Sequence, residues 1–219
     1  GREALVAKIW EWKEKYGDDI PVSEHPHIRS EEACYKSSLL ATTLAKRYNA
    51  KLHVLHLTTA KELEFFPPGP LKDKRITAEA CIHHLFFDES EYAKRGNFIK
   101  CNPAIKKATD RIALVKAVKD GRLDILATDH APHTLEEKSQ PYIKAPSGLP
   151  LVQHALLMAL ELAKRGELDL HTVVARTSHG VAERFGVKER GYIREGYWAD
   201  LVLVDPNTAT TATRDKVLY

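Results

Sequence analysis

The stretch Leu123-Asp124-Ile125-Leu126-Ala127-Thr128-Asp129-His130-Ala131-Pro132-His133 decides the fold class of this chain. Residues 123–128 form a short and largely apolar run, which is typical of a strand covered on both faces in a parallel sheet. Helical patterns flank this run: one from about 109 to 119 precedes it, and another begins after Pro150. The alternation of strand and helix predicts an α/β fold.

The same alternation continues along the rest of the chain. Three parallel strands are too few to close a barrel, which takes eight strands and about 250 residues, so they form either a small open sheet or a piece of a barrel. The pattern over 191–205 differs and predicts a two-stranded hairpin in a small β module. The other predicted elements are strands over 51–57 and 75–82 and helical stretches over 2–16, 30–48 and 170–185.

Composition excludes several classes of protein. The net charge of +3 comes from 33 basic and 30 acidic residues without a polybasic run, so neither nucleic acid nor an anionic membrane is required as a partner. No apolar run approaches a membrane span, and the first residues do not form a signal peptide. The three cysteines are far apart and odd in number, which argues against a disulfide framework and favours a reducing, cytoplasmic setting.

Asp129 is the strongest candidate for chemistry. It follows an apolar strand directly, and the residue at that end of a parallel strand points into the ligand crevice of such folds. A capping or turn aspartate is the common alternative at this place. His130 and His133 stand beside Asp129, and an aspartate with two histidines within five residues is a metal-binding or anion-binding composition.

Other candidates carry weaker signals. In a strand the side chain of His56 would point to the same face as those of Leu52 and Val54, so if these face the core, His56 does too. A lone strand histidine is, however, more often a core residue with one hydrogen bond. Asn102 could supply an amide to a ligand or simply begin a turn. Gly148, after Ser147, permits close approach of the backbone to a ligand or merely a turn.

Two pairs of histidines have ordinary interpretations. His83 and His84 are adjacent near the end of the second strand, so we expect one to be buried and the other to pack outside. His25 and His27 flank a proline, and we expect both to be solvated loop residues. No G-x-S-x-G elbow, P-loop or G-x-G-x-x-G motif supports another chemistry.

Taken together, these segments resemble the dihydroorotases of the amidohydrolase superfamily, over nearly the full length of the chain. The segment around Asp129 is the most specific of them, whereas the last is shared widely across amidohydrolases. The segments are 28–33, Leu52-His53-Val54-Leu55-His56-Leu57-Thr58-Thr59-Ala60, His83-His84-Leu85, Lys100-Cys101-Asn102-Pro103, Ala127-Thr128-Asp129-His130-Ala131-Pro132-His133, Pro146-Ser147-Gly148-Leu149-Pro150 and 196–203.

The resemblance implies a (β/α)8 barrel with a binuclear zinc site at its mouth and a β-sandwich built from both chain ends. Residues 1–188 would be the C-terminal part of the barrel, contributing its last three βα units, and residues 189–219 part of the sandwich. His56 would be a zinc ligand, and Asp129 both a zinc ligand and the general base. The residues that would hold the substrate are Asn102, His133 and the backbone of Ser147 and Gly148.

The implied activity is the interconversion of N-carbamoyl-L-aspartate and L-dihydroorotate in pyrimidine biosynthesis, by a cytoplasmic homodimer that could bind aspartate transcarbamoylase. A hydantoinase-like or allantoinase-like cyclic ureide hydrolase is one alternative, and a non-catalytic partner of aspartate transcarbamoylase is another. The other metal ligands of the family and its carboxylate-binding arginine are absent from residues 1–219. We therefore expect the chain to be an inactive part of a longer protein, with an incomplete zinc site.

Overall fold

A three-stranded parallel sheet lies at the centre of the computed structural model, which describes the backbone of residues 2–218 and the side chains of residues 5–218. The strands are β1 (Leu52–Val54), β2 (Ile76–Cys81) and β3 (Ile125–Ala127), in the order β1-β2-β3. The central strand β2 pairs with β1 at Leu52–Ile76 and with β3 at Glu79–Ile125. All three strands therefore end at the same edge of the sheet.

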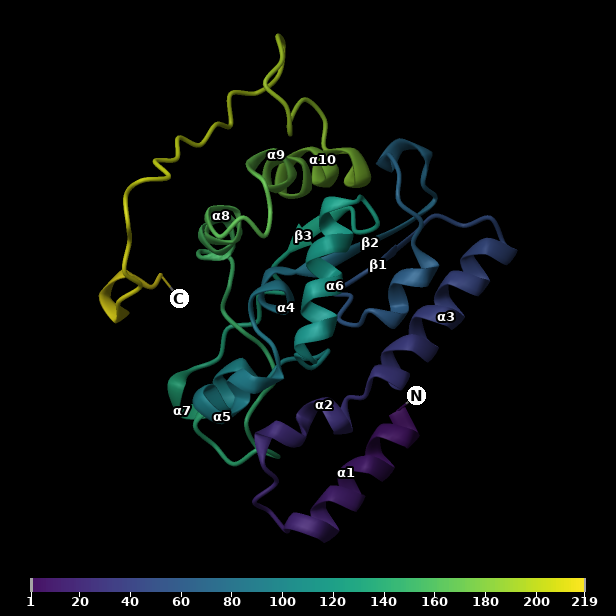
Figure 1. The fold of residues 1–219 in the computed structure, drawn as a ribbon, viewed down its shortest axis with the longest axis vertical. Helices are drawn as coiled ribbons and strands as arrows, with labels where there is room; N and C mark the ends of the chain where they lie inside the picture. The colour runs from purple at the N-terminus through teal and green to yellow at the C-terminus, as the bar shows by residue number, and fades with distance from the viewer. Residues whose placement is uncertain (1, 219) are drawn as a thin grey trace.

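Helices surround this sheet, and Figure 1 shows α6 crossing in front of it and α9 and α10 at the top of the view. Local signals explain where several helices begin. The Ser30 side chain accepts the Ala33 N–H at the start of α3, and Thr134 and Glu137 form a capping box at the start of α7. The helices are α1 (Arg2–Tyr16), α2 (His25–Ile28), α3 (Glu31–Arg47), α4 (Ile82–Phe86), α5 (Tyr92–Arg95), α6 (Ala108–Lys119), α7 (Leu135–Lys138), α8 (Ala155–Lys164), α9 (Leu170–Val174) and α10 (Gly180–Phe185).

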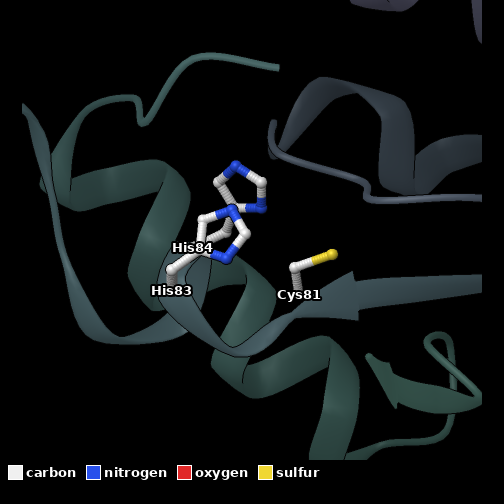
Figure 2. A group of neighbouring side chains, drawn as sticks. All are labelled: Cys81, His83 and His84. Atoms are coloured by element: carbon white, nitrogen blue, oxygen red, sulfur yellow. The ribbon is translucent and has the colours of Figure 1, made fainter. Parts of the chain in front are cut away.

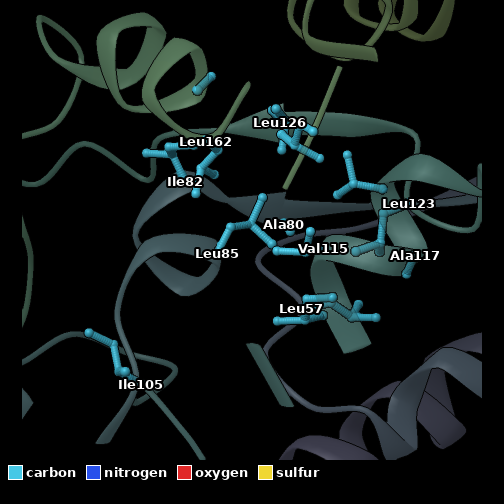
Figure 3. Close-up of a cluster of buried hydrophobic side chains, with 14 of the residues drawn as sticks. Leu57, Ala80, Ile82, Leu85, Ile105, Val115, Ala117, Leu123, Leu126 and Leu162 are labelled. Carbon is cyan, nitrogen blue, oxygen red and sulfur yellow. The ribbon is translucent and has the colours of Figure 1, made fainter. Parts of the chain in front are cut away.

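The two faces of the sheet differ in chemistry. One face contributes Ala80 and Leu126 to an apolar core, in which Leu162 of α8 is also buried (Figure 3). On the other face His53 bridges two side chains of β2: its Nδ1 lies 2.8 Å from Thr77 Oγ1 and its Nε2 lies 3.0 Å from Glu79 Oε2. The apolar face anchors the sheet to its helices, and the polar face is held by hydrogen bonds.

The predicted helices and strands are confirmed, although each strand is shorter than its apolar run. The predicted hairpin over 191–205 is wrong, because these residues, all of them described, contain no strand and are largely exposed. An isolated pair of strands is marginally stable without a third strand or a covering apolar surface. The assignment of residues 189–219 to a β-sandwich stays a prediction.

Among the described residues, no helix is both long enough and apolar enough to cross a lipid bilayer.

Candidate functional site

Two candidate residues stand at the shared edge of the sheet in an uncommon backbone conformation. His56 lies two residues past the end of β1 and has φ 42°, and Asp129 lies two residues past the end of β3 and has φ 44°. A positive φ is unusual for residues other than glycine, and strained positions of this kind cluster at functional sites. Glu79 helps to hold the first of them, because its Oε1 accepts the His56 N–H at 3.4 Å.

The end of β2 lies between these two positions and carries three side chains of types that can bind a metal ion. Cys81 is the last residue of β2, and His83 and His84 belong to the first turn of α4. One potential ligand atom from each of the three lies within 4.8 Å of the other two, and all three residues are buried (Figure 2).

The expectation that one of the two histidines packs outside is therefore wrong. Both are buried, at 1% and 3% exposure for His83 and His84, with their ring centroids 4.0 Å apart. Adjacent residues of a strand point to opposite faces of the sheet, but this rule does not apply to His83 and His84. The strand ends at Cys81, and both histidines belong to the helix that follows.

Electrostatic effects link the three strand ends. Burial, reinforced by the nearby imidazole of His56, lowers the pKa of His83 to about 3. Burial raises the pKa of the Cys81 thiol well above its usual range, and the carboxylates of Glu79 and Asp129 add to the rise. Burial also raises the pKa of the Cys101 thiol to about 12, with Asp129 among the charges that contribute. His56 and Asp129 thus lie near the end of β2, where Cys81, His83 and His84 form a cluster that we call the hub.

The predicted substrate-binding residues converge beside this hub. Gly148 donates its N–H to the Lys100 carbonyl at 2.9 Å, which brings the loop to the segment that carries Asn102. A methyl group on Gly148 would lie 3.2 Å from Cδ2 of His133, so these two residues are in close proximity. The Oδ1 atom of Asn102 is buried without a hydrogen-bond partner among the described residues. Such an atom is suited to receive a donor from a ligand.

Two buried lysines hold the loop that contains Ser147 and Gly148. Lys138 Nζ donates to the carbonyl oxygens of Lys100 at 3.0 Å, Pro146 at 3.0 Å and Gly148 at 2.9 Å. Lys100 Nζ donates to the carbonyl oxygens of Tyr142 and Ala145, at 2.5 and 2.6 Å. Since both backbone polar groups of Gly148 are engaged within the protein, Ser147 is the member of the pair whose backbone we propose faces a substrate.

Two other histidines support the backbone around the site. His130 Nδ1 accepts the N–H groups of Leu151 and Val152, at 2.9 and 3.0 Å, so this ring nitrogen fastens the end of the loop. His25 is 1% exposed, with Nε2 2.7 Å from the Cys101 carbonyl oxygen and Nδ1 2.8 Å from the Tyr142 hydroxyl. The prediction that His25 is a solvated loop residue is wrong, because His25 begins the short helix α2 and is buried there.

Comparison with known proteins gives consistent results. A sequence profile of the Amidohydrolase family matches residues 27–218. The chain is 38% identical over 169 residues to the dihydroorotase of Halobacterium salinarum, covering 77% of this chain and 39% of the relative. It is 34% identical over 174 residues to the dihydroorotase of Clostridium acetobutylicum, covering 79% and 41%. The chain therefore spans about two fifths of the length of these curated relatives.

Solved structures agree on the fold. An L-hydantoinase (dihydropyrimidinase) from Arthrobacter aurescens superposes with a TM-score of 0.82 at 21% identity, covering 90% of this chain and 44% of that one. The dihydroorotase of Saccharomyces cerevisiae in complex with 5-fluoroorotic acid gives 0.61 at 20% identity, covering 69% and 43%. These likenesses confirm that the three βα units are part of a barrel fold of the type predicted.

Proposed function

The chain belongs to the amidohydrolase family, and from that premise we propose that the intact protein is a zinc-dependent dihydroorotase. The reaction is the reversible hydrolysis of L-dihydroorotate to N-carbamoyl-L-aspartate, a step of pyrimidine biosynthesis. The observation that carries the proposal is that His56 and Asp129 follow strands that end at one edge of the sheet, both with positive φ. The Gly148 loop supports it, because this loop lies against His133 and is hydrogen-bonded to Lys100, two residues before Asn102. Identities of 38% and 34% to dihydroorotases support this substrate.

The residues present fit the proposed metal. An imidazole and a carboxylate, from His56 and Asp129, are donors that zinc accepts, and both are held on backbone fixed at strand ends. Zinc sites use three or four protein ligands, so we propose that parts of the intact protein outside residues 1–219 complete the binuclear site. When bound, zinc ions acidify water and polarise the amide carbonyl of the substrate.

The chain's own residues then have separate tasks in ring opening. The Asp129 carboxylate accepts a proton from the attacking water and passes it to the ring nitrogen that departs, and in ring closure the transfer is reversed. Asp129 is exposed, which gives a substrate access to its carboxylate. The Asn102 amide and the Ser147 backbone hold the pyrimidine ring, and the His133 imidazole binds the substrate carboxylate.

The decisive test is Asp129→Ala in the intact protein, assayed by the loss of dihydroorotate absorbance. We expect turnover to fall at least about 100-fold, because a general base contributes about 10²–10⁴-fold. Asp73→Ala is a matched control, since Asp73 is an exposed aspartate next to the N-terminal end of β2. Turnover like that of the wild type in the Asp129 variant would refute the assignment.

A substrate panel separates the alternatives. Hydantoin, allantoin and dihydroorotate are offered to the intact wild-type protein under the same conditions, and the proposal requires dihydroorotate to be the best substrate by kcat/KM. A preference for hydantoin or allantoin would replace it with a cyclic ureide hydrolase. Turnover of none of the three by zinc-loaded protein would favour a non-catalytic partner of aspartate transcarbamoylase.

The proposal extends to the setting and assembly of the protein. Three free cysteines among the described residues support a reducing, cytoplasmic compartment. We propose a homodimer that acts on a small molecule and needs neither nucleic acid nor membrane, with aspartate transcarbamoylase as a further partner. Light scattering on the intact protein, alone and mixed with aspartate transcarbamoylase, measures both associations.

A further inference from the structure

The hub formed by Cys81, His83 and His84 has no part in the proposed reaction, yet its side chains are arranged as metal ligands. Their candidate ligand atoms lie within 4.8 Å of one another, and Figure 2 shows the three side chains together where β2 ends and α4 begins, with the two rings tilted against each other. All three residues are at most 3% exposed. Hydrophobic packing alone does not require two adjacent buried histidines beside a cysteine.

His84 is oriented as metal-binding histidines usually are. Its Nε2 lies 3.0 Å from the carbonyl oxygen of Pro103 and donates to it. The proton of the neutral ring is then on Nε2, so Nδ1 carries a lone pair. That Nδ1 is buried without a hydrogen-bond partner among the described residues. A ring that donates one N–H to a carbonyl while its other nitrogen is ready to bind is the usual outer arrangement around a bound metal.

His83 provides an independent sign. Both of its ring nitrogens are buried without a partner among the described residues. A buried polar group that forgoes its hydrogen bond costs about 1–3 kcal/mol, so native proteins rarely leave one unpaired. A bound cation would use one of these nitrogens directly.

We propose that Cys81 Sγ, one ring nitrogen of His83 and Nδ1 of His84 bind a single zinc-like divalent ion. On binding, the Cys81 S–H bond breaks, its proton leaves to solvent, and a sulfur–metal bond forms. Thiolate and imidazole donors select zinc over magnesium and calcium, which prefer oxygen. Three protein ligands leave one position of a tetrahedral ion for water.

This site differs in chemistry from the one proposed for catalysis. His56 and Asp129 offer nitrogen and oxygen only, whereas the hub includes a sulfur atom. Sulfur ligation by Cys81 is therefore a signature that His56 and Asp129 cannot produce. The inference does not rest on the proposed function, because it would hold for a catalytic or a non-catalytic protein.

Cobalt substitution of the intact protein tests the proposal. Cobalt bound by a thiolate gives an intense near-ultraviolet charge-transfer band, and nitrogen and oxygen ligands do not. We expect the band in the wild type and its loss in Cys81→Ser, together with the loss of one bound metal per chain. Cys101→Ser is the matched control, since that cysteine is equally buried but its thiol donates to the Pro103 carbonyl, and we expect it to retain the band.

Three results would overturn the proposal: no band in the wild type, a band that persists in Cys81→Ser, or one that disappears in folded Cys101→Ser. X-ray absorption at the zinc edge of the wild-type protein gives an answer even if a variant does not fold. It should show a sulfur neighbour at about 2.3 Å besides nitrogen at about 2.0–2.1 Å, and its absence would also refute the site. Loss of activity in Asp129→Ala is a separate result, so the two proposals can fail independently.

Discussion

Replacing Gly148 with alanine tests the geometry of the substrate-binding loop. Gly148 has φ 152°, a conformation that L residues rarely adopt. An added Cβ would lie 2.6 Å from Cβ and 2.8 Å from the carbonyl oxygen of Ala131. Neither atom belongs to a flexible side chain that can move aside, so the loop or the segment after Asp129 must shift.

The expected loss of stability has two contributions. Backbone strain at a positive φ costs about 1–2 kcal/mol, and forcing an atom into a packed site adds about 1–3 kcal/mol. We therefore expect Gly148→Ala to lower the free energy of unfolding by about 2–5 kcal/mol. Gly166→Ala is the control for a glycine of positive φ in open space, because Gly166 has φ 73° and no atom lies within 4 Å of its added Cβ.

Urea denaturation of the two variants and the wild type measures both contributions, with unchanged m-values as the check that the unfolding transition is the same. The difference between the variants, about 1–3 kcal/mol, is the steric cost at Gly148. Equal losses in the two variants would refute the close packing of the loop against Ala131. If the loop also positions His133, the KM of intact Gly148→Ala for dihydroorotate should rise while Gly166→Ala leaves it unchanged.

Two further predictions concern the groups that hold the loop. Lys138→Met should lower the free energy of unfolding by about 2–4 kcal/mol, because three carbonyl oxygens lose a charged donor. The control is Lys144→Met at an exposed position, which should change the free energy of unfolding by less than about 0.5 kcal/mol in the same urea denaturation assay. Burial lowers the pKa of His25 from 6.5 to about 3, so between these values the unfolded chain takes a proton that the native protein refuses, and stability falls as the pH falls. His25→Gln should remove a slope of up to about 1.4 kcal/mol per pH unit from urea melts at pH 7 to 4, and an unchanged slope would contradict the assignment.

The sequence predicted the regular elements well because each has a local cause. Apolar runs specify the three strands, and the stripe after Pro150 specifies α8. The predicted hairpin over 191–205 failed because a strand pattern needs partners, and the described residues provide none for it. The spacing of apolar residues shows which face of a segment can be buried. Whether the segment forms a strand depends on a partner strand that pairs with it.

The candidate site was predicted in part. Asp129 and His56 could be named because they follow apolar strands, and the structure adds the positive φ that both share. Lys138 was missed, since a lone lysine in a polar loop carries no signal that it will be buried among carbonyl groups. Cys81 was missed as well, because a single cysteine on a strand looks like any small core residue until its neighbours are known.

By itself, the sequence determined the α/β class and the approximate positions of the strands, because local apolar runs indicate both. Only the tertiary structure decided that Cys81, His83 and His84 share one buried hub and that Gly148 lies against His133. Both results depend on pairing between segments far apart in the chain. Burial removes water from a histidine or a lysine and lowers its pKa only when those segments come together. No local sequence pattern indicates this change.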